Sequence, residues 1–106
     1  MASIGQVTRQ GNGFKGHLKT LSFRANITIV PNTDKNAANQ PDYRVLNDGA
    51  EIGSAWTRRS KSSGNDYISL SLSDPAFGPK ILYANLGRMG GQDDDDVLAV
   101  IWNAKK

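Results

Sequence analysis

The sequence contains no cysteine, one histidine, four prolines and no apolar run as long as a membrane span. Without cysteine there can be neither a disulfide framework nor a thiolate metal site, which fits a reducing compartment. A membrane-spanning helix needs about 18 or more consecutive apolar residues, so no membrane role is expected. The first residues also lack the basic flank and apolar core of a signal peptide. We therefore expect a cytoplasmic protein.

Acidic residues are scarce outside one run. The chain carries 13 basic and 10 acidic residues, and Asp93 to Asp96 supply four of the acidic ones. The remaining residues are thirteen basic against six acidic, a net of +7, and no acidic residue precedes Asp34. This imbalance predicts a basic face and an anionic partner. Solubility alone is the alternative explanation.

Long helical periodicity is also missing, and short alternating segments separated by glycine and asparagine turns take its place. We expect one all-β domain over residues 1–106, with seven or eight antiparallel strands in a barrel-like or two-layer sandwich arrangement. Residues 31–41, bounded by prolines, are expected to form a mobile surface loop in which a single helical turn over 34–38 is an option. Residues 87–96 are expected to form an acidic loop. The predicted strands cover residues 4–9, 14–20, 21–30, 43–46, both arms of a hairpin over 51–75, 81–86 and 97–102.

The hairpin over residues 51–75 is the feature around which the sequence is organised. Alternation directs Ile52, Ser54 and Trp56 inward on its first arm, and Ile68, Leu70 and Leu72 inward on its second. Its outer face is then small and polar, with Tyr67 exposed and a cationic tip. The segment 97–102 has no polar residue, so both of its faces are expected to be covered. The expected core is Phe14, Phe23, Ile27, Ile29, Trp56, Ile68, Leu70, Leu72 and Trp102.

Two earlier segments alternate in the same way. Between residues 14 and 20, Lys15, His17 and Lys19 fall on one side and form a basic stripe that faces solvent. Between residues 21 and 30, Leu21 and the other apolar residues face inward, while Arg24 faces outward.

No arrangement typical of catalysis or metal binding is present. Gly11, Gly13 and Gly16 match a dinucleotide fingerprint in letters only, because the residues that follow alternate as a strand instead of opening a helix. The single histidine, His17, has no orienting carboxylate beside it, and no nucleophile elbow exists. The run Asp93 to Asp96 lacks the alternate spacing and glycine of a calcium loop. We therefore expect no enzyme activity, no metal and no cofactor.

The basic residues instead indicate binding to nucleic acid, single- or double-stranded, through phosphates and an exposed aromatic side chain. A protein-interaction module that regulates or inhibits other machinery is the alternative, and the oligomeric state is left open. The expected nucleic-acid-binding residues are Lys15, His17, Lys19, Arg24, Arg58, Arg59, Lys61 and Tyr67.

A set of short matches in order along the chain resembles one bacterial family. They are Ile4-Gly5, Gly13-Phe14-x-Gly16, Leu18-x-Thr20-Leu21, Pro41-Asp42-Tyr43-Arg44-Val45, Glu51-Ile52-Gly53-x-Ala55-Trp56, Asp66-Tyr67-Ile68-Ser69-Leu70, Asp74-Pro75, Tyr83-Ala84-Asn85-Leu86 and Ile101-Trp102. The chain is similar over nearly its whole length to the family called domain of unknown function 736. The resemblance implies a small stand-alone protein of proteobacteria, often encoded on plasmids and other mobile genetic elements. It implies no established activity, so no catalytic residue is carried over. The acidic segment after Gly87 departs from the shorter linker expected of the family.

Overall fold

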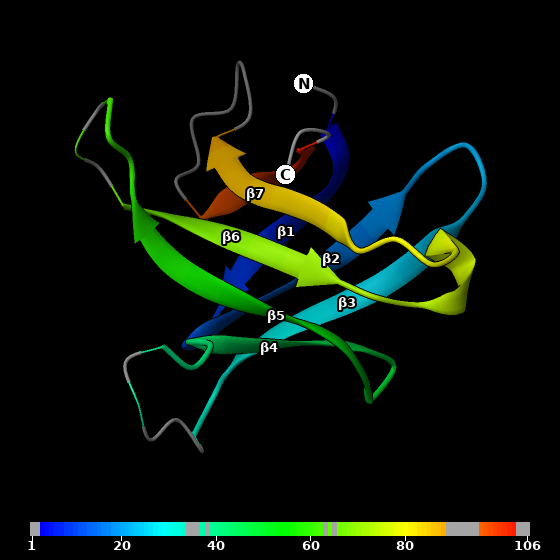
Figure 1. Cartoon of the computed structure of the whole chain (residues 1–106), viewed down its shortest axis with the longest axis horizontal. Coiled ribbons are helices and arrows are strands. Elements are labelled where there is room, and N and C mark those ends of the chain that lie inside the picture. Colours follow the sequence, from blue (N-terminus) through cyan, green and yellow to red (C-terminus); the bar gives the residue numbers. More distant parts are fainter. Residues whose placement is uncertain are drawn as a thin grey trace.

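A computed structural model describes residues 3–33, 37, 39–62, 64, 66–88 and 96–103 of the chain. Eight antiparallel strands, each paired with the next, close into a barrel when the last strand pairs with the first (Figure 1). This confirms the all-β prediction and selects the barrel over the sandwich. No helix of the described residues is long and apolar enough to cross a membrane. The elements are β1 (Ser3–Gln10), β2 (Gly13–Lys19), β3 (Arg24–Pro31), β4 (Tyr43–Asn47), β5 (Ala50–Arg59), β6 (Asp66–Leu72), a short 3-10 helix η1 (Pro75–Phe77), β7 (Leu82–Arg88) and β8 (Val97–Trp102).

Turn chemistry fixes the shortest connections. Asp48 and Gly49 both have positive φ, 49° and 91°, as a two-residue type I′ turn between β4 and β5 requires. The loop between β3 and β4 is closed at its base, where the side-chain amide of Asn32 donates to the carbonyl of Pro41 over 2.9 Å. Most of the helical turn considered over 34–38, and most of the acidic loop, lie outside the described residues.

Apolar side chains from all eight strands fill the barrel. An eight-stranded barrel is just wide enough for its inward side chains to pack together, and here Leu18, Ile29, Val45, Leu70 and Val100 are fully buried. Of the expected core, five residues are buried and two, Phe23 and Ile68, pack against the core from a half-buried position. The five buried ones are Phe14, Ile27, Ile29, Leu70 and Leu72.

A β-bulge overturns the predicted phase of the first hairpin arm. Val45 pairs with Gly53 but its neighbour Leu46 pairs with Glu51, so Ile52 is an extra residue on β5. Ile52 packs against the core as predicted. Beyond the bulge the alternation is inverted, and Ala55, opposite Leu70, is the buried residue.

The inversion turns Ser54 and Trp56 outward. Both residues were predicted to point inward, and Trp56 was expected in the core. Trp56 instead pairs across the sheet with Ser69 on the outer face, and its side chain is only half-buried.

Two further apolar residues expected inside lie outside. Leu21 is fully exposed because Thr20 to Phe23 form a turn instead of the start of a strand, with the Thr20 hydroxyl accepting from the Ser22 and Phe23 amides over 3.2 Å. Trp102 is 42% exposed because it is the last residue of β8, at the rim of the barrel. The prediction that both faces of 97–102 are covered is therefore wrong at its end.

Candidate nucleic-acid interface

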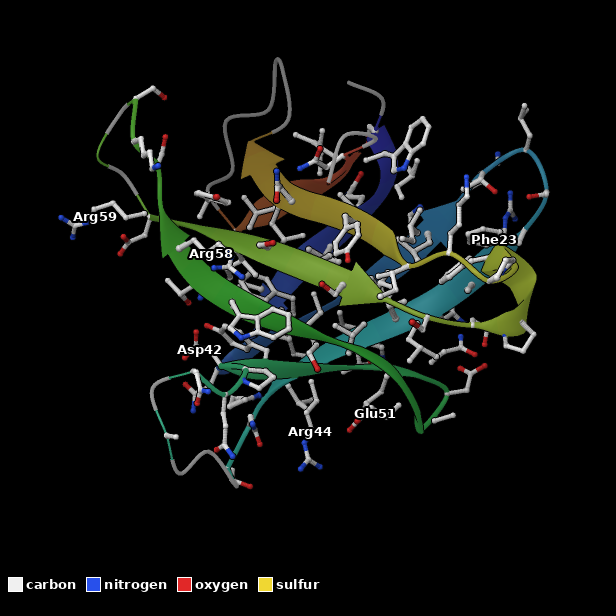
Figure 2. All side chains as sticks on the ribbon, viewed as in Figure 1. Phe23, Asp42, Arg44, Glu51, Arg58 and Arg59 are labelled. Atoms are coloured by element: carbon white, nitrogen blue, oxygen red, sulfur yellow. The ribbon has the colours of Figure 1, made fainter. Side chains whose placement is uncertain are left out.

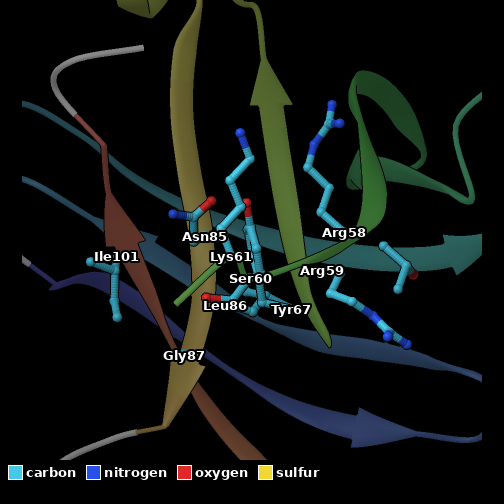
Figure 3. A pocket seen from close by; sticks show the side chains of 10 residues that line it. Arg58, Arg59, Ser60, Lys61, Tyr67, Asn85, Leu86, Gly87 and Ile101 are labelled. Atoms are coloured by element: carbon cyan, nitrogen blue, oxygen red, sulfur yellow. The ribbon is translucent and has the colours of Figure 1, made fainter. Parts of the chain in front are cut away.

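Because side chains fill the barrel, a ligand site has to lie on its outer surface or at its rims. An open groove of about 790 Å³ runs along the outside of β5 to β8, beneath the projecting β5–β6 hairpin (Figure 3). Arg58, Arg59, Lys61, Tyr67 and Asn85 line it. In Figure 3, Arg58 and Arg59 lie on one side of Tyr67, and Lys61 and Asn85 lie on the other. The groove therefore combines cations, an aromatic ring and an amide.

Three side chains on the outer face of β5 and β6 form a cationic and aromatic cluster. The Arg58 guanidinium carbon lies 5.6 Å from the ring centroid of Trp56, within the range of a cation–π contact. Arg58 is directly opposite Tyr67 in the register, and Trp56 is opposite Ser69. Ser69 points outward yet is only 5% exposed, so neighbouring side chains cover it. We call Trp56, Arg58 and Tyr67 the stacking cluster.

Residues of β7 and β8 form the floor of the groove, and Asn85 is the polar side chain among them. Asn85 faces outward on β7, opposite Ser69 on one side and Ile101 on the other. Its side-chain amide makes no hydrogen bond with the described residues, so one donor and one acceptor face the groove. The Ile101 side chain packs over Gly87, since a methyl group at Gly87 would come within 2.7 Å of it. The floor thus offers the Asn85 amide for hydrogen bonds to the edge of a bound group.

The hairpin that carries the cations extends beyond its neighbour β4. Past Ala55, β5 pairs with β6 alone, and Figure 1 shows the hairpin projecting from the barrel wall. The Asp42 carboxylate accepts a hydrogen bond from the Thr57 amide over 2.8 Å, which fixes the backbone between Trp56 and Arg58 (Figure 2). At the tip, Arg59 pairs with Asp66 over 3.6 Å, but both side chains are mostly exposed, so the pair is weak and screened by salt.

The structure divides the predicted site residues between two walls of the barrel. Arg58, Arg59, Lys61 and Tyr67 line the groove together. Lys15, His17, Lys19 and Arg24 are exposed on the outer face of β2 and β3. In the ring of eight strands β2 is four strands from β6, so the two groups lie on opposite walls. A single short ligand cannot contact both.

Sequence reasoning missed Asn85, Gly87 and Ile101 as groove residues, and it missed the outward position of Trp56 beside the groove. A signal for Trp56 was present, because a glycine inside a strand often marks a bulge, and Gly53 precedes the inverted phase. The other three come from β7 and β8, and only the closed sheet brings them beside the hairpin.

Among the described residues there is no group of three histidine, cysteine, aspartate or glutamate side chains that could hold a metal ion. The first three aspartates of the acidic run lie outside the described residues. Asp96 is described, and its carboxylate pairs with the Arg9 guanidinium over 3.5 Å while its carbonyl accepts from the Arg9 amide over 2.7 Å.

An apolar surface occupies the end of the barrel opposite the hairpin tip. Leu21, Ile81 and Trp102 are the exposed large hydrophobic residues of the described chain, and they gather in two adjoining open grooves with Leu82 between them. Lys19 and Lys80 border these grooves, and no carboxylate lines either.

The protein is therefore a small closed β-barrel with a cationic and aromatic groove on its outer wall. No curated protein and no solved structure is significantly similar to the chain. A family model does match residues 3–105, and the chain belongs to that family, described as Protein of unknown function (DUF736).

Proposed function

We propose that the protein binds single-stranded nucleic acid in the groove outside β5 to β8, as a binding module and not an enzyme. The observation that carries the proposal is the stacking cluster: Trp56 and Tyr67 are placed by the register on the same outer face, with Arg58 against the indole. Proteins that bind single strands combine cations that follow the phosphates with aromatic rings on which bases stack.

The remaining groove residues suit the same ligand. Arg58, Arg59 and Lys61 supply up to three phosphate contacts. The unpaired amide of Asn85 suits the donor and acceptor edge of a base that has left its stack. We further propose that the protein acts in the bacterial cytoplasm on nucleic acid of plasmids or other mobile elements, in line with the family resemblance.

A titration of fluorescently labelled oligothymidine, read by anisotropy, tests the proposal. Because one stacked base is worth about 1 to 3 kcal/mol, Tyr67→Ala should weaken binding by about 5- to 150-fold. Trp102→Ala removes an exposed aromatic ring at the other end of the barrel and should leave the affinity unchanged. Equal effects of the two substitutions on the affinity would show that the groove is not the binding site.

Docking of a protein is the second candidate function, favoured by the apolar surface around Leu21, Ile81 and Trp102. Its border carries Lys19 and Lys80 without a carboxylate, so the partner is an apolar segment flanked by acidic residues. A second copy of the chain fits less well, because a symmetric contact would bring these lysines toward each other.

A labelled peptide composed of leucines and glutamates tests this candidate. The control is the same peptide with lysines in place of the glutamates. Selective binding of the acidic peptide that Leu21→Asp abolishes would support docking. Equal binding of both peptides would contradict it.

A further inference from the structure

The outer face of β2 and β3 carries several exposed cations. Lys15, Lys19 and Arg24 are exposed and form no ion pair with a carboxylate of the described residues. By contrast, Arg9, Arg44 and Arg59 each contact a carboxylate, at 3.5, 3.6 and 3.6 Å. Within the described part of the chain, Lys15, Lys19 and Arg24 thus form an exposed cationic face without a carboxylate partner.

The register makes this arrangement unfavourable without a ligand. Lys19 lies directly opposite Arg24, and like charges in that position destabilise a pair of strands. The four strands β1 to β4 contain no acidic residue that could relieve the repulsion. A bound anion would relieve it.

The chemistry of the face selects the kind of anion. Its remaining outward residues are hydroxyl and amide side chains such as Asn26 and Thr28, opposite His17 and Lys15. The aromatic residues of β2 and β4, Phe14 and Tyr43, lie on the inward face and contact each other edge to face. Among the described residues, no phenylalanine, tyrosine or tryptophan ring faces outward here and His17 supplies a single imidazole, so this face suits a polyanion whose bases are already paired.

Spacing favours an extended ligand over a single phosphate. Lys15, His17 and Lys19 alternate along β2, so successive side chains are roughly 6.7 Å apart and the stripe is roughly 13 Å long. Duplex DNA carries about one phosphate charge per 1.7 Å of its axis, so several phosphates fall within that length.

We propose that the outer face of β2 and β3 binds the phosphate backbone of duplex nucleic acid. The barrel then holds a duplex on this wall and a single strand in the groove on the opposite wall. The second half of this inference rests on the function proposed for the groove, whereas the duplex site does not.

Two variants with the same charge change test the duplex site. Lys19→Glu should weaken the binding of a short blunt DNA duplex at least about fivefold at low salt, because it removes one phosphate contact and adds a repulsion. The melting temperature of the Lys19→Glu protein should rise, because the new carboxylate faces Arg24. Lys61→Glu at the hairpin tip should leave duplex binding unchanged and weaken oligothymidine binding. Equal loss of duplex binding in both variants would overturn the inference.

Competition tests whether the two ligands occupy separate walls. Saturating duplex should leave labelled oligothymidine bound, whereas displacement at stoichiometric duplex would show one shared site and overturn the two-wall arrangement. Inorganic polyphosphate that displaces the duplex at equal charge concentration would assign the face to polyanions in general and overturn the choice of a duplex. If oligothymidine does not bind but Lys19→Glu still weakens duplex binding, the groove proposal fails and the duplex site stands.

Discussion

At the scale of single residues, the position of Trp56 decides how the outer wall is understood. Its indole contacts the Arg58 guanidinium and lies opposite Ser69, while the interior below is filled by Ala55 and Leu70. Tryptophan has the largest aromatic ring for stacking, and its outward position beside the groove is what the proposed stacking requires.

Truncation at Trp56 should therefore cost less stability than truncation in the core. Phe14 is 2% exposed and contacts Tyr43, so Phe14→Ala should lower the free energy of unfolding by about 3 to 5 kcal/mol. Trp56→Ala should lower it by only about 1 kcal/mol, as is typical away from the core. Urea titrations of both variants measure the difference, and a larger loss for Trp56→Ala would return this residue to the core.

Alternation alone predicted most residue orientations correctly. Lys15, His17 and Lys19 face outward as expected, and so does Tyr67. Alternation failed at Trp56, because the β-bulge on β5 changed its phase. It also failed where Thr20 and Ser22 form a turn that no glycine or proline marks.

At the scale of elements, close contact between strands shapes the barrel. A side chain at Gly16 would overlap the backbone of Gln6 and Val7 on β1, and one at Gly53 would overlap the carbonyl of Ser71 on β6. These glycines let the strands approach and bend as a small barrel requires.

Gly16→Ala should consequently destabilise the fold by about 1 to 3 kcal/mol or more, because the obstructing atoms belong to the backbone and cannot rotate away. Gly87→Ala is the matched control, since its methyl group would meet only the end of the Ile101 side chain. Thermal melts of the two variants compare the positions. Equal melting temperatures would contradict the tight approach of β1 and β2.

Element boundaries were predictable where turn residues mark them. The turns at Gly11-Asn12 and Asp48-Gly49 lie where expected, and the connection through Asp74 and Pro75 also ends β6 as predicted. The closure between β1 and β8 could not be predicted, because pairing of the first and last strands leaves no local pattern.

At the scale of the whole molecule, cations lie on two opposite walls of the barrel, and the rings differ between these walls. On the wall of β2 and β3 the described outward ring is the His17 imidazole, whereas the groove wall combines the rings of Trp56 and Tyr67 with three cations. The sequence indicated the cations of both groups and Tyr67, but it treated them as one basic face. Only the closed order of strands shows that they lie apart.

Salt dependence should reflect the small number of cations in the groove. With up to three phosphate contacts, the log–log slope of oligothymidine affinity against salt should be no steeper than about −2. A double substitution of Arg58 and Lys61 by glutamate should flatten it by about 1.4. Anisotropy titrations at several salt concentrations give both slopes. An unchanged slope in the double variant would place the phosphates elsewhere.

Quenching of a single tryptophan tests the central claim, that unpaired bases stack in the groove outside β5 to β8. The chain has two tryptophans, and they lie at different ends of the barrel wall, so each can be observed alone. In Trp102→Phe, the fluorescence of Trp56 should fall on addition of oligothymidine, with the same midpoint as the anisotropy change. In Trp56→Phe, the fluorescence of Trp102 should not change. Binding without quenching of Trp56, or quenching confined to Trp102, would contradict the account.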